Sequence, residues 1–160
     1  KKHVIWLHKP FMGREIERKF LVKGEFRHLA VRKYDILQRY LSIDTDKTIR
    51  LRLTGDTALL TIKGRPQSGS ISRGEWEIPL NPDDAREIMN LCLPGSVEKT
   101  RYVVPFENHS FEVDVFHGKN EGLVIAELEL DSEEEQFEKP EWLGEEVTGR
   151  SEYYNSSLIG

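Results

Sequence analysis

Charged side chains recur two residues apart in six short segments of the chain. Acidic pairs stand at Glu15 and Glu17, Glu75 and Glu77, Glu112 and Asp114, and Glu127 and Glu129; basic pairs stand at Arg50 and Arg52 and at Lys99 and Arg101. In a β-strand, residues i and i+2 project from the same face. Each segment therefore places at least two charges on one face of an expected strand.

These residue types are suited to binding a polyphosphate together with a divalent cation. Arg offers forked donors to phosphoryl oxygens, and Lys offers a compact positive charge. Carboxylates in the same cavity would repel a bare polyphosphate, but they bind Mg²⁺ or Mn²⁺, which then bridge to phosphate oxygens. Such a metal can also activate a water molecule, so the chemistry needs no Ser or Cys nucleophile.

The segments that carry these charges read as β-strands, because apolar and polar residues alternate along them. The expected strands are Arg14–Val22, Asp35–Ile43, Thr48–Thr54, Thr57–Lys63, Arg73–Leu80, Val97–Pro105, Ser110–His117 and Gly122–Leu130. Turn residues such as Thr54-Gly55-Asp56 join several of them closely, which implies antiparallel neighbours. The Gly64–Ser72 segment is expected to be a mobile hairpin loop.

Four segments are candidates for helices. The best begins at Asn81-Pro82-Asp83-Asp84, with Pro in the first turn and acids near the positive end of the helix dipole, and it ends at Pro94-Gly95. Gly24–Arg32 is a weaker candidate. Another helix is expected to begin at Ser132 and to stop before Pro140, and a last short one to run from Glu152 to Leu158.

The charge pattern leaves two arrangements of the strands open. In an ordinary half-buried sheet, the polar face would lie in water. Such a face normally mixes Ser, Thr and Gln with the charges, whereas here charge pairs are segregated by sign on separate strands. The pattern therefore favours a barrel in which the charges point into the lumen and the apolar residues point outward, beneath the helices after Pro82 and Ser132.

The predicted fold class is α+β: a closed eight-stranded antiparallel β-barrel, or tunnel, with a polar lumen and a few flanking helices. Burying ions is costly unless they are paired, hydrated or bound to a ligand. The acids of the four acidic pairs and the bases Lys19, Arg50, Arg52, Lys63, Arg73, Lys99 and Arg101 nearly cancel in charge, which makes such a lumen plausible.

Composition narrows the function classes further. A formal net charge of −5 argues against a general nucleic-acid binder. The single cysteine, Cys92, excludes an internal disulfide and fits a reducing cytoplasm. No apolar run is long enough to suggest a membrane partner. We expect residues 1–11 to be an N-terminal extension and residues 12–160 to form a single domain.

The run Glu15-Ile16-Glu17-Arg18-Lys19 resembles the Glu-x-Glu-x-Lys signature of the CYTH superfamily, the triphosphate tunnel metalloenzymes, and in particular their short bacterial members. Later segments resemble family strands in the expected order; they are Thr48-Ile49-Arg50-Leu51-Arg52, Thr61-Ile62-Lys63, Arg73-Gly74-Glu75-Trp76-Glu77, Glu98-Lys99-Thr100-Arg101-Tyr102, Glu112-Val113-Asp114-Val115-Phe116 and Glu127-Leu128-Glu129. The resemblance covers Met12 to Leu158 and implies an eight-stranded tunnel that binds triphosphate with Mg²⁺ or Mn²⁺.

The resemblance also implies roles for individual residues. The metal ligands would be Glu15, Glu17, Glu127 and Glu129, joined by Asp114, with Glu75 as a further helper. The substrate-binding residues would be Lys19, Arg50, Arg52, Lys63, Arg73, Lys99 and Arg101, of which Lys19, Arg52 and Lys99 are the candidates for catalytic residues.

The leading functional hypothesis is metal-dependent hydrolysis of a linear triphosphate, with inorganic tripolyphosphate as the preferred small-molecule substrate and pyrophosphate and phosphate as products. The alternatives are a class IV-type adenylate cyclase and a thiamine or nucleoside triphosphatase. A non-catalytic polyphosphate-binding module is the hypothesis from another class, and the complete set of paired acids argues against it. The oligomeric state stays open, with a homodimer as one alternative.

Overall fold

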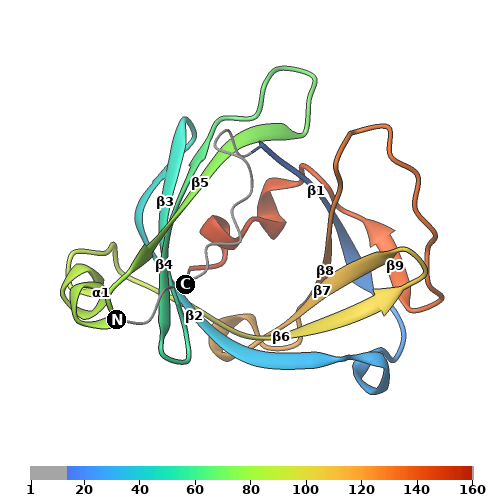
Figure 1. The fold of residues 1–160 in the computed structure, drawn as a ribbon, viewed down its shortest axis with the longest axis horizontal. Coiled ribbons are helices and arrows are strands. Elements are labelled where there is room, and N and C mark those ends of the chain that lie inside the picture. The colour runs from blue at the N-terminus through green and yellow to red at the C-terminus, as the bar shows by residue number, and fades with distance from the viewer. Residues whose placement is uncertain (1–13, 160) are drawn as a thin grey trace, which may run out of the picture.

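Nine antiparallel strands form one continuous sheet that closes on itself, as the computed structural model of residues 14–159 shows (Figure 1). The strands are β1 (Arg14–Val22), β2 (Arg32–Asp44), β3 (Lys47–Thr54), β4 (Thr57–Gly64), β5 (Ser72–Leu80), β6 (Val97–Phe106), β7 (His109–Phe116), β8 (Val124–Glu129) and β9 (Leu143–Glu146). The expected extension, residues 1–11, lies outside the described residues, and the division into extension and domain stays a prediction.

Pairing between β5 and β1 closes the barrel. The sheet order is β5-β4-β3-β2-β6-β7-β8-β1-β9, and Arg14 and Ile16 of β1 lie opposite Gly74 and Ser72 of β5. The closed eight-stranded antiparallel barrel is therefore confirmed. The short strand β9, which pairs with the C-terminal half of β1 outside this ring, was not predicted.

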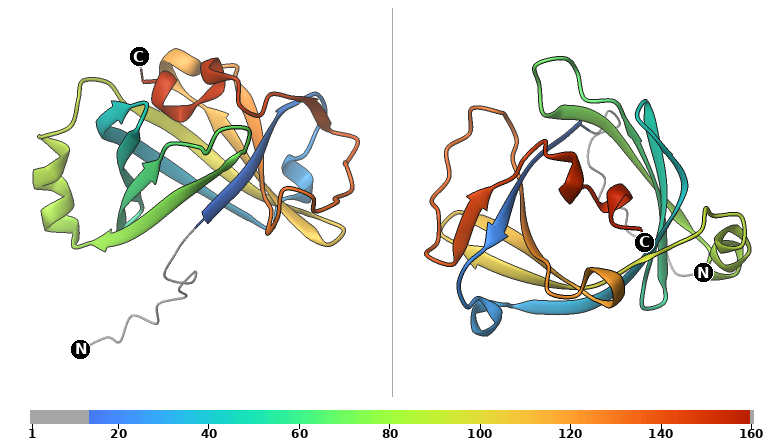
Figure 2. Two further views of the ribbon diagram at one scale, coloured as in Figure 1. Left: turned by 90° about the horizontal axis from the view of Figure 1, so that it is seen from above. Right: turned by 180° about the vertical axis from the view of Figure 1, so that it is seen from behind.

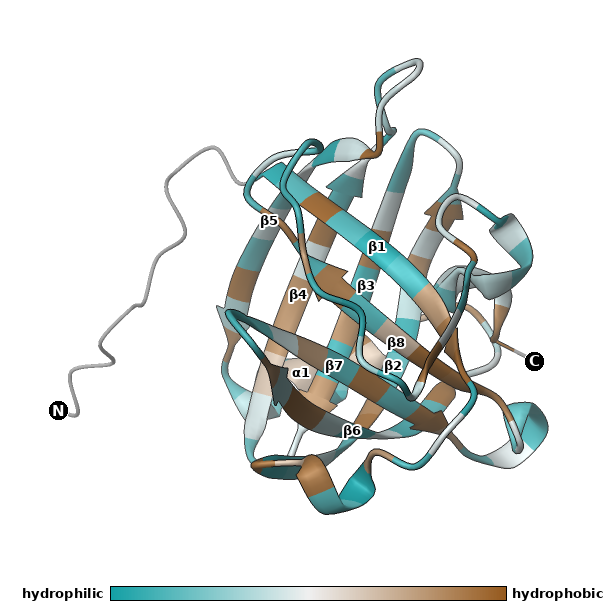
Figure 3. Ribbon diagram, turned by 90° about the vertical axis from the view of Figure 1, so that its right-hand side faces the viewer, coloured by the Kyte–Doolittle hydropathy of each residue, from teal (hydrophilic) through white to brown (hydrophobic). Residues whose placement is uncertain are grey.

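The inward placement of charge and the outward placement of apolar residues are confirmed. Along β8, Glu127 lines the lumen, whereas its neighbour Leu128 is buried in an apolar cluster. Figure 3 shows the same alternation of hydrophilic and hydrophobic residues along the barrel wall. The largest apolar core thus lies against the outer side of β1, β6, β7 and β8, and it contains Phe20, Phe26, Val104, Phe111, Val113, Ala126, Leu128, Leu130, Trp142 and Leu143.

This outer core is not covered by the helix expected after Ser132; that prediction is wrong. Residues 131–142 contain no helix. Glu133 Oε1 instead accepts hydrogen bonds from Ser70 Oγ and Ile71 N, at 2.7 and 2.8 Å, in the loop after β4. Phe137 packs edge-on against Phe20, with ring centroids 5.8 Å apart. Helix propensity differs by only tenths of a kcal/mol per residue, so these tertiary contacts outweigh it.

All the other helical segments are shorter than expected. The helix α1 (Pro82–Met89) begins where predicted, with the Asn81 side chain accepting a hydrogen bond from Asp83 N at 2.8 Å, but it ends at Met89, before the predicted end at Pro94-Gly95. Gly24–Arg32 contains only the 3₁₀ turn η1 (Arg27–Leu29), and a further turn, η2 (Gly118–Asn120), follows β7. Glu152–Leu158 is not an α-helix; the C-terminal segment contains the 3₁₀ turns η3 (Ser151–Tyr153) and η4 (Asn155–Ser157).

Helix α1 covers a second, smaller apolar cluster on the outside of the barrel. Its buried residue Ala85 packs against Leu51 of β3 and Ala58 of β4. The chain returns from α1 to the barrel through a loop that leads into β6. Within residues 14–159 there is no helix with both the length and the apolar character needed to cross a bilayer.

Gly144 allows β9 to lie against β1. A Cβ atom at this position would stand 2.8 Å from the backbone oxygen of Leu21, and the strand backbone cannot move aside. We expect Gly144→Ala to lower the free energy of unfolding by about 1–3 kcal/mol, as measured by urea denaturation. Gly64→Ala is the matched control, because the nearest atom to its Cβ would be 3.9 Å away. Equal stability of the two variants would contradict the prediction.

Candidate active site

The lumen of the barrel contains a cavity of about 650 Å³. Most of the predicted site residues line it: Glu15, Glu17, Lys19, Arg50, Arg52, Lys63, Arg73, Arg101, Glu127 and Glu129, together with Glu75, Glu77 and Glu112. Side chains from β1, β3, β4, β5, β6, β7 and β8 therefore meet in one cavity, as the alternation along the predicted strands indicated. Two predicted residues, Lys99 and Asp114, do not line the cavity but are fully buried beside it, where Lys99 contacts the cavity-lining residue Asn155.

A cluster of carboxylates stands where β1 and β8 pair. Glu17 lies opposite Glu129, and Lys19 lies opposite Glu127. Lys19 Nζ is 3.9 Å from Glu17 Oε1 and 3.7 Å from Glu127 Oε1, so one ammonium serves two carboxylates. Burial and the negative charges of Glu127 and Glu15 hold the pKa of Glu17 well above its ordinary value.

The donor set of this cluster fits a divalent cation such as Mg²⁺ or Mn²⁺. Hard carboxylate oxygens that repel one another, as those of Glu17 and Glu127 do, gain a counter-charge when a cation lies between them. Among residues 14–159, no three acidic, His or Cys side chains form a complete metal cluster. Mg²⁺ commonly uses one or two carboxylates and fills its remaining positions with water and substrate phosphates, so an ion shared with the substrate suits this site.

Glu15 holds two cations at the β4–β5 side of the cavity. Its carboxylate accepts hydrogen bonds from Lys63 Nζ at 2.8 and 2.9 Å and from Arg73 Nε at 3.1 Å. Burial alone would raise the pKa of Glu15, but Lys63 and Arg73 outweigh it and lower the pKa to about 2. The ionised carboxylate therefore fixes two of the predicted substrate-binding residues in the lumen.

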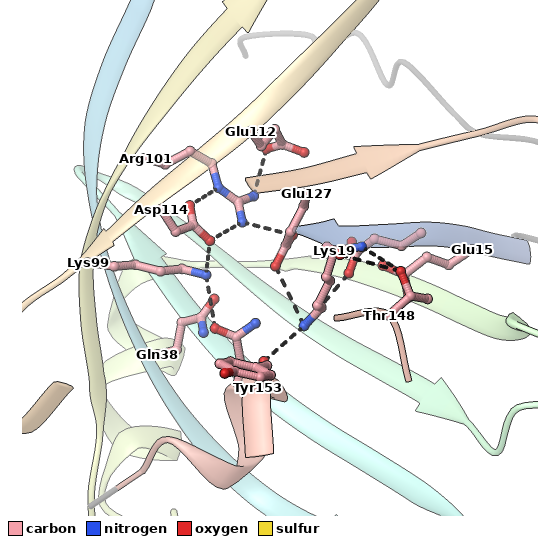
Figure 4. A network of polar contacts seen from close by, with 12 residues as sticks. Glu15, Lys19, Gln38, Lys99, Arg101, Glu112, Asp114, Glu127, Thr148 and Tyr153 are labelled. Atoms are coloured by element: carbon pink, nitrogen blue, oxygen red, sulfur yellow. Dashed lines mark hydrogen bonds and ion pairs between the residues drawn. The ribbon is translucent and has the colours of Figure 1, made fainter. Parts of the chain in front are cut away.

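Lys99, Arg101 and Asp114 form a charge network on the inner side of the barrel (Figure 4). Asp114 Oδ2 accepts from Lys99 Nζ at 2.6 Å and from Arg101 Nη2 at 2.8 Å, and Asp114 Oδ1 accepts from Arg101 Nε at 2.7 Å. Arg101 also reaches Glu112 at 2.6 Å and Glu127 at 3.3 Å. To serve as a metal ligand, Asp114 would have to release one of its cations; in the structure it acts as their counter-charge.

The buried position of Lys99 changes its acid–base behaviour. Its ammonium is fully covered, and its second partner is Asn155 Oδ1 at 3.1 Å. Burial lowers the pKa of Lys99, Asp114 raises it and Arg101 lowers it, and the result is a pKa of about 7. To contact a phosphoryl group, Lys99 would have to exchange Asp114 or Asn155 for the substrate.

Two arginines of β3 point into the cavity and are held by neutral side chains. Arg50 Nη2 donates to Thr61 Oγ1 at 3.2 Å, and Arg52 Nε donates to Gln38 Oε1 at 2.7 Å. Burial and the charges of Arg50 and Arg101 lower the pKa of Arg52 to about 10, so its guanidinium still carries its full charge at neutral pH. These donors suit an anionic ligand, because no protein carboxylate neutralises them at hydrogen-bonding distance among the described residues.

The C-terminal segment also enters the lumen, which the sequence did not predict. Figure 2 shows η3 and η4 inside the ring of strands, and the residues from this segment that line the cavity are Ser151, Tyr154, Asn155, Ser156 and Ser157. Lys19 Nζ donates to the carbonyl oxygen of Tyr153 at 3.4 Å. Tyr153 and Leu158 pack against an apolar cluster at one end of the barrel, which anchors the segment. The alternation of charged and apolar residues is a property of strands, so it could not indicate that this non-strand segment enters the lumen.

Comparison with known proteins agrees with this geometry. The model of the CYTH domain family matches residues 13–158. The inorganic triphosphatase of Acetivibrio thermocellus is 45% identical over 149 residues, which are 92% of this chain and 94% of that protein. The inorganic triphosphatase of Nitrosomonas europaea is 37% identical over 152 residues, covering 90% of this chain and 95% of that protein.

A solved structure is similar over nearly the same range. The crystal structure of the inorganic triphosphatase NE1496 superimposes with a TM-score of 0.61 at 33% identity, and it covers 91% of this chain and 93% of that one.

Proposed function

Since the chain belongs to the CYTH domain family, we propose that it is a metal-dependent triphosphatase that hydrolyses inorganic triphosphate to pyrophosphate and phosphate. The observation that carries this proposal is a cavity in which uncompensated guanidinium groups face a cluster of carboxylates. The cations suit the phosphoryl oxygens, and the carboxylates suit a divalent ion that neutralises the rest of the substrate charge.

The substrate-binding residues of this proposal surround the lumen. Lys19, Arg50, Arg52, Lys63, Arg73 and Arg101 line the cavity and would donate to the oxygens of a linear triphosphate. Lys19 and Arg52 are the proposed catalytic residues, because a fixed positive charge stabilises the charge that develops on a phosphoryl group in the transition state. The predicted catalytic role of Lys99 and the predicted metal ligation by Asp114 stay predictions.

Glu15, Glu17, Glu127 and Glu129 are the proposed residues that hold the metal. Mg²⁺ or Mn²⁺ would supply charge neutralisation and an acidified water molecule for hydrolysis. Water attacks the terminal phosphorus, the bond to the bridging oxygen breaks, and that oxygen leaves as part of pyrophosphate. Glu15, Lys19 and Glu127 are themselves buried, so their charges would act at reduced dielectric screening.

Inorganic triphosphate is the preferred substrate in this proposal, in line with the names of both curated relatives. The proposed location is the cytoplasm, and neither nucleic acid nor a membrane is a proposed partner. A homodimer is retained as an alternative to the monomer. Sedimentation of the purified chain at several concentrations tests that assembly.

A phosphate-release assay tests the proposed function. Tripolyphosphate should be hydrolysed with a kcat/KM at least about tenfold above that for ATP, because many of the side chains that line the lumen are charged groups suited to phosphates and metal rather than to a nucleobase. Formation of cyclic AMP from ATP would identify a cyclase, and preferential release from thiamine triphosphate would identify that alternative. Tight binding of tripolyphosphate without release of phosphate would identify a binding module.

Removal of divalent cations should abolish turnover. We expect phosphate release to fall to background in excess chelator and to return when Mg²⁺ or Mn²⁺ is added, because the clustered carboxylates and the substrate repel one another without a cation. The urea midpoint, measured in the same buffers, controls for unfolding. A full rate in the chelated sample would contradict the proposed metal dependence.

A further inference from the structure

Gln38 is a buried polar residue next to the candidate active site with no assigned role. It lies in the middle of β2, is 0% exposed, and does not line the cavity. Its direct cross-strand partner on β3 is Arg52, and its partner on β6 is Val97. A fully buried glutamine between a guanidinium and an apolar neighbour needs a reason, because polar groups are costly to remove from water.

One end of the Gln38 amide is defined by Arg52. Gln38 Oε1 accepts a hydrogen bond from Arg52 Nε at 2.7 Å. A guanidinium donates and never accepts, so this contact fixes which end of the amide faces the arginine. Since Nε is engaged, the donors of Arg52 that remain for a ligand in the cavity are its two Nη groups.

The other end of the amide is not satisfied by the protein. Gln38 Nε2 is buried and has no hydrogen-bond partner among the described residues. An apolar side chain of similar size would fill the same space without leaving a donor unpaired. Packing alone therefore does not explain why this position holds a glutamine. The hydrogen bond from Arg52 to the amide oxygen explains it.

A neutral acceptor is the suitable partner for this arginine. Arg50 and Arg101 repel Arg52, so the guanidinium needs an acceptor to hold its orientation. A carboxylate would hold it firmly but would neutralise the charge that the substrate needs. The amide oxygen orients Arg52 and leaves its positive charge available.

We propose that Gln38 is a positioning residue of the triphosphatase reaction, which holds Arg52 Nε so that the Nη groups of Arg52 face the phosphoryl groups of the substrate. This inference rests on the proposed function and adds to it a residue that never touches the substrate. Because Gln38 acts through one arginine, its removal has no effect of its own once that arginine is gone.

A double-mutant cycle with Arg52 tests the proposal. Gln38→Leu should lower kcat/KM for tripolyphosphate by about 10–100-fold in the natural background, but by less than about twofold in the Arg52→Ala background. The rate of the double variant can be too low to measure, so the dissociation constant for pyrophosphate is also measured by calorimetry in all four proteins. Gln38→Leu should raise this constant in the natural background but not in the Arg52→Ala background. Gln38→Glu should also lower kcat/KM, because it keeps an acceptor but neutralises Arg52.

Controls separate positioning from loss of structure. Gln136→Leu should leave kcat/KM unchanged, because Gln136 Nε2 donates to Glu134 O in the segment outside the barrel. Gln38→Met is the second variant if Gln38→Leu does not fold. Equal losses from the Gln38 substitution with and without Arg52 would overturn the inference while leaving the proposed function intact. Absence of triphosphatase activity in the natural protein would overturn the proposed function itself, and the pyrophosphate cycle would still decide whether Gln38 acts through Arg52.

Discussion

Replacement of both Glu127 and Glu129 by Gln is expected to lower kcat for tripolyphosphate by about 10²–10³-fold or more. Both side chains line the cavity on β8, beside Glu17 of β1. The substitution keeps their size and removes two negative charges that would hold the metal. Phosphate release at saturating Mg²⁺ or Mn²⁺ measures the loss.

Anion binding should survive this double substitution. The guanidinium groups of Arg50 and Arg52 stay in place, and fewer carboxylates oppose the substrate, so tripolyphosphate should still bind when measured by calorimetry without metal. Glu87→Gln, on the exposed side of α1, is the matched control and should keep the natural rate. A double variant that turns over as fast as the control would refute metal binding by these acids.

Asp114→Asn is expected to lower the free energy of unfolding by about 3–5 kcal/mol, because it leaves the buried Lys99 without a counter-charge and removes one of the three carboxylates that contact Arg101. Asp114 is 0% exposed and accepts hydrogen bonds from Lys99 and from both Nε and Nη2 of Arg101. Urea denaturation should show a midpoint lower by about 1 M or more.

Loss of the Lys99 ammonium should cost less stability than loss of the Asp114 carboxylate. Lys99→Met should destabilise the protein less than Asp114→Asn, because Asp114 keeps its two hydrogen bonds to Arg101. Asp56→Asn, in the exposed turn between β3 and β4, is the control and should change stability by less than about 0.5 kcal/mol. If Asp114→Asn unfolds at the same urea concentration as this control, the network does not support the barrel wall.

Strand periodicity made much of the barrel predictable. The bounds of β1 agree with the prediction at both ends, and those of β3, β4 and β6 agree within one residue. Successive side chains along a strand point to opposite faces of the sheet, so the order of charged and apolar residues indicates which face each side chain occupies. Short turns such as Thr54-Gly55-Asp56 are too short for the crossover that parallel strands need, so the strands they join pair antiparallel, as β3 and β4 do.

The conformations of two irregular segments could not be predicted from strand periodicity. Residues 131–142 carry a glutamate run that reads as a helix start, but the contacts of Glu133 and Phe137 with distant parts of the chain decide their conformation. The C-terminal segment carries no periodic signal, and its entry into the lumen depends on the packing of Tyr153 and Leu158 at the end of the barrel. Such contacts join residues far apart in sequence, so local propensity cannot reveal them.

The amino-acid sequence by itself determined which side chains share the lumen, because that follows from alternation along each strand. Only the tertiary structure decided how deep each charge lies and which partner it holds. Lys99 and Asp114 have the same alternation as Arg101 and Glu112, yet they are fully buried, Lys99 against Asn155 of the C-terminal segment and Asp114 against Lys99 and Arg101, whereas Arg101 and Glu112 reach the cavity. Depth depends on what packs above a residue, and here that covering segment is not a strand.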